Sequence, residues 1–126
     1  MLDRAASTST ETPDAVPHEQ GRPDVDAAPV RSPGTLTAAG DLLRVLAAPV
    51  RISIVLQLRE SARCVHELVD VLGVAQPLIS QHLRVLKSAG VVEGERHGRE
   101  VVYRLVDEHL SHIVVDAVAH VEEARS

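Results

Sequence analysis

Tyr103 is the only aromatic residue in this chain of 126 residues, which contains neither Trp nor Phe. The hydrophobic residues make up 44% of the chain, so any core must be built from Leu, Val, Ile and Ala. Helix-rich packing suits this set of side chains better than a large sheet does. The length suits one globular domain and is too short for two. We therefore expect a single, mainly helical domain.

Residues 1–37 differ in composition from the rest of the chain. They contain five of the seven prolines and eight Ser or Thr residues, and their apolar residues follow neither helical nor strand spacing. Such a segment buries too little apolar surface to offset the entropy of ordering. We expect a disordered N-terminal tail over residues 1–37 and an ordered domain over residues 38–126. The tail has six acids against three arginines, which accounts for −3 of the formal charge of −5.

The sequence predicts a cytoplasmic protein without a membrane partner. No apolar run reaches the roughly 18 residues needed to cross a bilayer. Acids and prolines occupy the first 30 residues, where a secretory signal would be apolar. The single cysteine, Cys64, cannot form a disulfide within one chain and excludes a four-thiolate metal site there.

The ordered part predicts several short helices and one hairpin. Apolar residues from Leu36 to Leu46 indicate a first helix, and Pro49 begins a second one. A third helix is expected from about Cys64 to Leu72, closed by Gly73. The next elements are a helix opened by Pro77 with Gln76 as its cap and ended by Gly90, two β-type runs around a polar tip at residues 94–99, and a last helix from about Asp107.

Two short helices joined across Gly73 and followed at once by a hairpin have the order of a winged helix-turn-helix. On the helix opened by Pro77, the apolar side chains of Ile79, Leu83 and Leu86 share one face, and polar groups lie opposite. Amide, hydroxyl and guanidinium groups are what base edges and phosphates require, although any amphipathic helix has a solvated polar face. The residues expected to contact DNA are Gln76, Ser80, Gln81, His82, Arg84 and Lys87 on this helix, and Arg96 and Arg99 at the hairpin tip.

The last helix carries side chains that can bind a metal ion. At about 100° and 1.5 Å per residue, His109 and His120 point the same way but lie about 16 Å apart. Asp107 with His109, and His120 with Glu123, therefore form two half-sites that an antiparallel partner helix would complete. Two N and two O ligands suit Zn²⁺, with Co²⁺ as its mimic; the alternative is a solvated polar stripe. Two nearby residues are candidate supporting partners or substitute ligands: His112 and Asp116.

Four stretches together resemble the ArsR/SmtB family of metal-sensing repressors. They read AAPVRI (47–52), CVHEL (64–68), QPLISQHLRVL (76–86) and GREVVYRL (98–105), and the resemblance covers about residues 38–126. It implies a homodimer of winged helix-turn-helix subunits that pairs through the first and last helices. Such a dimer binds an inverted-repeat operator when metal-free and is released by zinc. The spacing Asp107-x-His109 and His120-x-x-Glu123 resembles the zinc site that members of this family carry on the last helix.

Cys64-Val65-His66 stands where thiophilic members of this family carry a Cys-x-Cys pair. Because His66 replaces the second cysteine, we expect Cys64 to be a small buried residue rather than a ligand or redox switch. Two rival functions remain. One is a winged-helix regulator that does not sense zinc and is constitutive or responds through Cys64 and His66. The other is a small zinc enzyme, which we do not expect because four protein ligands leave no position for water.

Overall fold

The computed structural model describes residues 25–125, of which residues 25–31 are exposed and form neither helix nor strand. The greater part of the predicted tail, residues 1–24, lies outside the described residues. A separate compact unit spans Ser32–Ser126. Its first helix begins at Pro33, so the predicted start of the ordered domain at residue 38 is five residues too late. The helix starts there because the Ser32 side chain accepts a hydrogen bond from the Thr35 N–H and Pro33 occupies the first turn.

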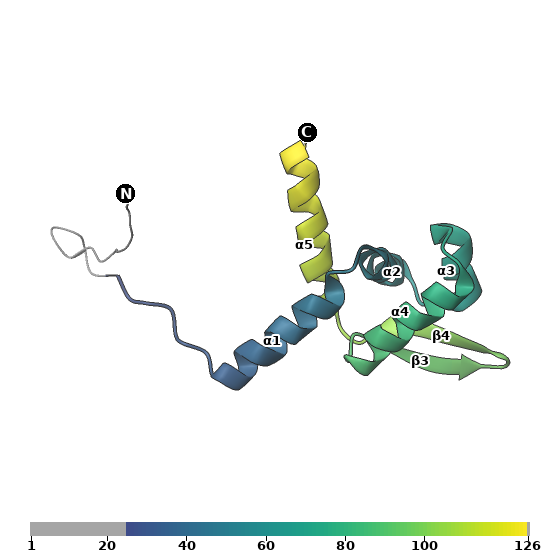
Figure 1. Cartoon of the computed structure of the whole chain (residues 1–126), viewed down its shortest axis with the longest axis horizontal. Coiled ribbons are helices and arrows are strands. Elements are labelled where there is room, and N and C mark those ends of the chain that lie inside the picture. The colour runs from purple at the N-terminus through teal and green to yellow at the C-terminus, as the bar shows by residue number, and fades with distance from the viewer. Residues whose placement is uncertain (1–24, 126) are drawn as a thin grey trace, which may run out of the picture. The chain divides into compact units, whose positions relative to one another are not determined.

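Within its described residues, this unit has five helices and three short strands (Figure 1), which agrees with the expected mainly helical fold with a small hairpin. In chain order they are α1 (Pro33–Leu46), α2 (Pro49–Glu60), β2 (Arg63–Cys64), α3 (Val65–Leu72), α4 (Gln76–Ser88), β3 (Val92–His97), β4 (Glu100–Leu105) and α5 (Glu108–Arg125). No helix among these combines the length and apolarity needed to cross a membrane.

Proline and glycine set several of the helix ends, largely as predicted. Pro49 stands in the first turn of α2, and Gly73 closes α3 in the left-handed conformation with φ of 67°. The predicted cap of α4 was one residue off: Ala75 is the N-cap, and Gln76 is the first helical residue. Ala75 makes no side-chain capping bond, so residue type gave no indication of this position.

The core is entirely aliphatic and lies where α2, α3, α4 and α5 meet the base of the hairpin. Ile79, Leu83 and Leu86 are fully buried, as the spacing along α4 predicted. Leu110 and Val114 bury the inner side of α5, which packs on α2. The buried cluster consists of Leu46, Ile54, Val55, Leu58, Leu68, Ile79, Leu83, Leu86, Val91, Val92, Leu110 and Val114.

The sheet has the order β2-β4-β3 and is antiparallel throughout. The register of the hairpin runs from Val92 opposite Leu105 to His97 opposite Glu100. Strand β2, which pairs Cys64 with Val102, was not predicted. A strand of two residues shows no alternation of its own, because its only signal is the long-range pairing.

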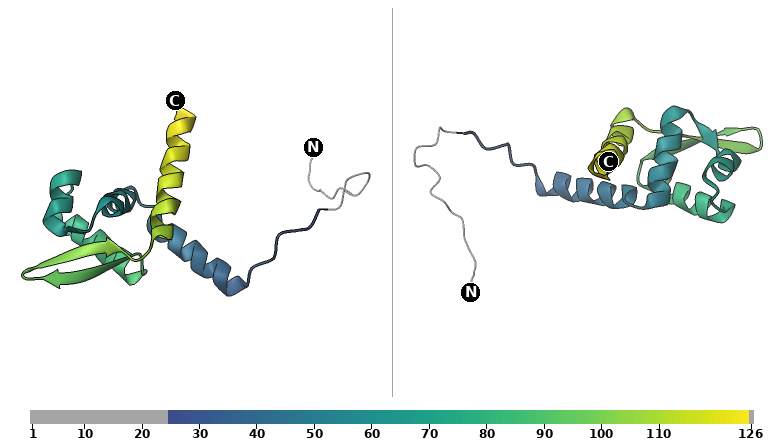
Figure 2. Two further views of the ribbon diagram at one scale, coloured as in Figure 1. Left: turned by 180° about the vertical axis from the view of Figure 1, so that it is seen from behind. Right: turned by 90° about the horizontal axis from the view of Figure 1, so that it is seen from above.

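Figures 1 and 2 show α1 and α5 at the end of this unit that lies opposite the tip of the β3–β4 hairpin. Helices α3 and α4 pack on each other, and α4 contacts β3. We refer to β3, β4 and the turn between them as the wing. The helix-turn-helix and the wing therefore lie side by side, away from the outer parts of α1 and α5.

Gly94 in β3 provides a test of wing packing. A Cβ atom at this position would lie 2.8 Å from Val101 Cγ1 and 3.1 Å from Tyr103 Cε1. We expect Gly94→Ala to lower the free energy of unfolding by about 1–3 kcal/mol, because a β-branched neighbour and a ring must shift. Urea denaturation followed by circular dichroism measures this change. Gly34→Ala is the matched control, since no atom lies within 4 Å of its Cβ position and alanine favours helix. Equal stabilities of the two variants would contradict the close packing of the wing at Gly94.

Candidate nucleic-acid interface and metal sites

Helix α4 presents most of its predicted DNA-contacting side chains to solvent. Gln76, Gln81, Arg84 and Lys87 are exposed. Of these, Gln81 and Arg84 lie on the side away from the buried Ile79 and Leu86. Within the described part of the chain, neither Arg84 nor Lys87 takes part in an ion pair. Cations without a partner are free to neutralise phosphates, and amides can pair with base edges.

The other two predicted contacts on α4, Ser80 and His82, are only half-exposed. The Nδ1 atom of His82 is buried without a hydrogen-bond partner, so this nitrogen does not face the surface. Leu78, which the sequence analysis did not single out, is 49% exposed and stands one helical turn before Gln81 and His82. The position of Leu78 on the helix, beside the buried Ile79, indicates that it is exposed. The apolar group that the major groove presents to such a side chain is the thymine methyl.

Some charged side chains of the wing form ion pairs, whereas others have no ion-pair partner among the described residues. Arg104 donates from Nε to Glu93 Oε2 and from Nη1 to Glu95 Oε1, each at 3.1 Å. The hydrogen bond from Arg104 holds the pKa of Glu95 below its usual value, and the two glutamates raise the pKa of Arg104. Among the described residues, Arg96 and Arg99 join no ion pair and are exposed. Arg104 thus neutralises Glu93 and Glu95, while the predicted DNA contacts Arg96 and Arg99 remain available.

At the start of α5, the structure brings Asp107 and His109 together. The Nδ1 atom of His109 lies 3.6 Å from Asp107 Oδ1, and His109 is almost fully exposed. The same carboxylate accepts a hydrogen bond from the Leu110 N–H and so caps the start of this helix. His120 and Glu123 are exposed near the other end of α5. No group of three ligands includes these residues within the described part of a single chain.

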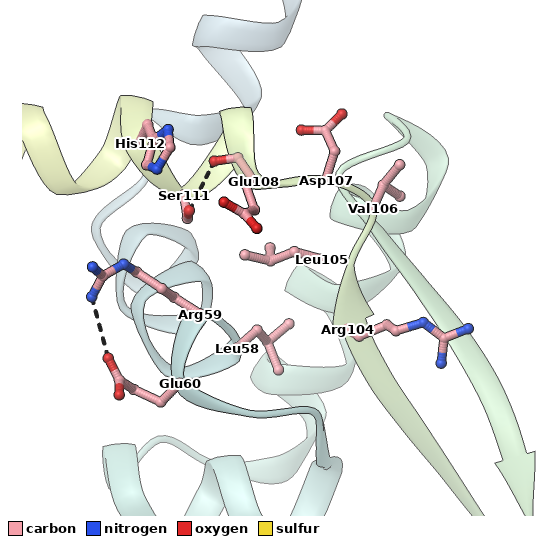
Figure 3. Close-up of a pocket in the computed structure, with 10 residues that line it drawn as sticks. All are labelled: Leu58, Arg59, Glu60, Arg104, Leu105, Val106, Asp107, Glu108, Ser111 and His112. Atoms are coloured by element: carbon pink, nitrogen blue, oxygen red, sulfur yellow. Dashed lines mark hydrogen bonds and ion pairs between the residues drawn. The ribbon is translucent and has the colours of Figure 1, made fainter.

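A cavity of about 620 Å³ lies between the end of α2, the end of β4 and the start of α5 (Figure 3). In Figure 3 the Asp107 carboxylate points away from the apolar floor formed by Leu58 and Leu105, whereas Ser111 donates to the Glu108 carbonyl oxygen at 2.9 Å. Asp107 and His112 both line this open cavity. Their side chains are therefore accessible from outside the subunit.

A second group of ligand-type side chains joins α3 to the wing. Cys64, His66 and Glu100 each offer an atom within 4.8 Å of the others, and this is the one such cluster of three among the described residues. The Sγ atom of Cys64 lies 3.2 Å from His66 Nδ1, which lies 3.3 Å from Glu100 Oε2. Glu100 was not predicted as part of any site. It comes close to Cys64 through the pairing of β2 with β4, which sequence spacing does not reveal.

Cys64 itself is 5% exposed, in agreement with the expected small buried residue. Burial raises the pKa of its thiol, and Glu67 accepts hydrogen bonds from both the Cys64 backbone N–H and the Sγ. The backbone N–H of Cys64 in turn lowers the pKa of the Glu67 carboxyl. The neighbouring cavity, of about 310 Å³, is also lined by Gln76 and Arg99. Because its pKa is raised, the thiol is protonated at neutral pH. The predicted DNA contacts Gln76 and Arg99 line the same cavity.

Comparison with known proteins gives close relatives. Residues 48–94 match the family described as bacterial regulatory protein, arsR family. The HTH-type transcriptional repressor SmtB of Mycobacterium tuberculosis is 76% identical over 88 residues, which are 70% of this chain and 65% of the repressor. The chain thus aligns with slightly less than two thirds of that protein's length. The HTH-type transcriptional regulator NmtR of Mycobacterium tuberculosis is 38% identical over 96 residues, covering 76% of this chain and 79% of NmtR.

A solved structure supports the fold and the family. The homodimeric winged helix-turn-helix DNA-binding domain of a possible ArsR-family transcriptional regulator from Mycobacterium bovis has a TM-score of 0.65 and 25% identity. The match covers 72% of this chain and 84% of that domain, and it confirms the winged helix-turn-helix predicted from the sequence. The named relatives are transcription regulators, which confirms the expectation of a non-enzymatic chain. This chain belongs to the ArsR family of bacterial regulatory proteins.

Proposed function

We propose that the chain is a transcriptional repressor that binds an inverted-repeat operator as a metal-free homodimer in the cytoplasm and leaves it when Zn²⁺ binds between the two α5 helices. The observation that carries this proposal is the accessible pair Asp107–His109 at one end of α5, with the exposed His120 and Glu123 near the other end. Each pair offers two of the four ligands that zinc prefers. The similarity to the SmtB repressor supports repression as the regulatory role.

The DNA half of the proposal rests on α4 and the wing. Recognition helices of this class lie in the major groove, where Gln81 and Arg84 would face base edges and phosphates. Arg96 and Arg99 of the wing would contact the backbone beside that groove. A net charge of −5 does not oppose this assignment, because phosphates respond to local unpaired cations rather than to the total.

The dimer follows from the surfaces that α1 and α5 leave uncovered. Leu36 and Leu43 of α1, and Ile113 and Val121 of α5, are large apolar side chains with considerable exposure. A second copy of the chain that pairs through these two helices covers them, and the similar domain from Mycobacterium bovis is homodimeric. In an antiparallel pair, Asp107 and His109 of one subunit meet His120 and Glu123 of the other.

Zinc and DNA then oppose each other through the geometry of the dimer. Ligands that join two subunits favour one arrangement of those subunits, and release from the operator requires that this arrangement fits DNA less well. The coupling is reciprocal, so operator DNA weakens zinc binding by the same factor. Asp107 is well placed for this coupling, because it caps α5 and directly follows the connection from the wing strand β4.

Cys64, His66 and Glu100 favour a second candidate function, in which the regulator responds through this cluster instead of α5. A thiolate, an imidazole and a carboxylate make a soft, mixed ligand set for zinc or a similar ion. Against this candidate, the thiol has a raised pKa and must lose its proton before it can bind a metal. We therefore propose the α5 half-sites, rather than this cluster, as the sites through which the regulator responds to zinc.

The DNA assignment predicts two kinds of loss. Gln81→Ala is expected to cost about 1–3 kcal/mol on the correct operator and to relax specificity at one base pair, since it removes a base contact. Arg99→Ala is expected to weaken binding to all sequences and to reduce the salt dependence by about one counterion. Fluorescence anisotropy on operator and random DNA at several salt concentrations measures both. Equal losses on operator and random DNA for Gln81→Ala would exclude this residue from base reading.

The geometry of the α5 sites is tested by mixing two variants. His109→Ala and His120→Ala homodimers each lose both of the proposed zinc sites, because each of these two sites needs both histidines. The mixed dimer has one site without either histidine and one site with all four ligands. It is therefore expected to bind one more zinc ion tightly than either homodimeric variant. Competition with a chromophoric chelator counts the zinc. No regain would show that the site does not form between subunits.

Cys64→Ser distinguishes the two candidate sites. Under the first proposal, zinc still releases this variant from operator DNA with an unchanged midpoint, because α5 retains all its ligands. Anisotropy of labelled operator during zinc titration measures the release, with Cys64→Ala as a control for the lost thiol volume. If release disappears in Cys64→Ser while DNA affinity is kept, the response runs through Cys64, His66 and Glu100.

A further inference from the structure

Helix α5 carries more ligand-type side chains than the two proposed zinc half-sites use. Five of them form what we call the ligand stripe: His109, His112, Asp116, His120 and Glu123. At about 100° per residue, these five lie within an arc of about 80°. The buried Leu110 and Val114 lie on the other side, so the stripe faces away from the core of its own subunit.

His112 and Asp116 are the two members of the stripe that the proposed function leaves without a role. Both are exposed, and within the described residues neither side chain takes part in a hydrogen bond or ion pair. They stand one helical turn apart, about 6 Å along the axis. Histidine and carboxylate side chains at this spacing can bind one metal ion from a single helix face.

Their position along the helix is the second observation. We call the two proposed zinc sites the outer sites. If they are equivalent, the two-fold axis of the dimer runs between the two α5 helices, level with the midpoint between His109 and His120. The midpoint of His112 and Asp116 lies within about 1 Å of that point along the helix axis. With packed helices about 8–10 Å apart, the four side chains of the two subunits face a common space on the axis.

We infer that the dimer holds a third divalent-cation site on its two-fold axis, formed by His112 and Asp116 of one subunit and the same residues of its partner. This inference rests on the proposed antiparallel pairing of α5. The site offers two imidazole nitrogens and two carboxylate oxygens, which is the ligand set of the outer sites. The dimer therefore binds three zinc ions rather than two, and the central ion contacts both subunits equally.

The experiment counts zinc in the full-length dimer, in a Cys64→Ser background that removes the thiol cluster. Metal-free protein is titrated with Zn²⁺ against a chromophoric chelator, and Co²⁺ absorption provides a separate count of tetrahedral sites. We expect three ions per dimer for this background and two for both His112→Ala and Asp116→Asn. His109→Ala is expected to retain one. His97→Gln, on the wing, is the matched control for loss of a histidine and is expected to retain three.

The variants distinguish this inference from the proposed function. Two ions in the background protein, unchanged by His112→Ala and Asp116→Asn, would overturn the axial site and leave the two outer sites intact. No ion in His109→Ala would also overturn it. A background protein that binds none would overturn both proposals. Light scattering during each titration shows whether the variant is still a dimer. If His112→Ala is monomeric, the zinc count comes from Asp116→Asn, which keeps the side-chain shape.

Discussion

The packing of α5 on α2 determines the direction of every side chain on the last helix. Leu110 and Val114 are buried in this contact, and Ser111 is held by a hydrogen bond to the Glu108 carbonyl oxygen. Because a helix repeats every 3.6 residues, burying one side places the ligand stripe of α5 on the opposite side. One aliphatic contact thus positions both the metal ligands and the apolar residues available to a second subunit.

The sequence was most informative where local periodicity and special backbone residues agree. The aliphatic spacing on α4, the left-handed Gly73 and the glycine-bounded hairpin were all predicted, because each is a property of a few neighbouring residues. The proximity of Asp107 to His109 also followed from local spacing. The start of α1 was placed too late because Ser32 and Pro33 were counted with the proline-rich segment, although together they form a capped helix start.

The missed features depend on residues far apart in the chain. Glu100 reaches Cys64 and His66 only because β2 pairs with β4, and a two-residue strand has no pattern to recognise. The half-buried state of His82 depends on how α4 packs within the domain, which helical spacing alone does not give. A complete α5 site needs ligands from a second subunit, so it depends on contacts between chains rather than on spacing within one chain.

The wing illustrates how a slightly acidic domain can still present positive charge. Arg104 pairs with Glu93 and Glu95, so the unpaired guanidinium groups of Arg96 and Arg99 dominate the field near the turn. Tyr103 lies in the same strand, with its ring against the Gly94 backbone position and beside the cavity of Cys64. Since the chain has no Trp and no other Tyr, all of its intrinsic ultraviolet fluorescence comes from this ring. The protein therefore carries a natural optical probe in the wing, and its emission can be followed without a label or background from elsewhere in the fold.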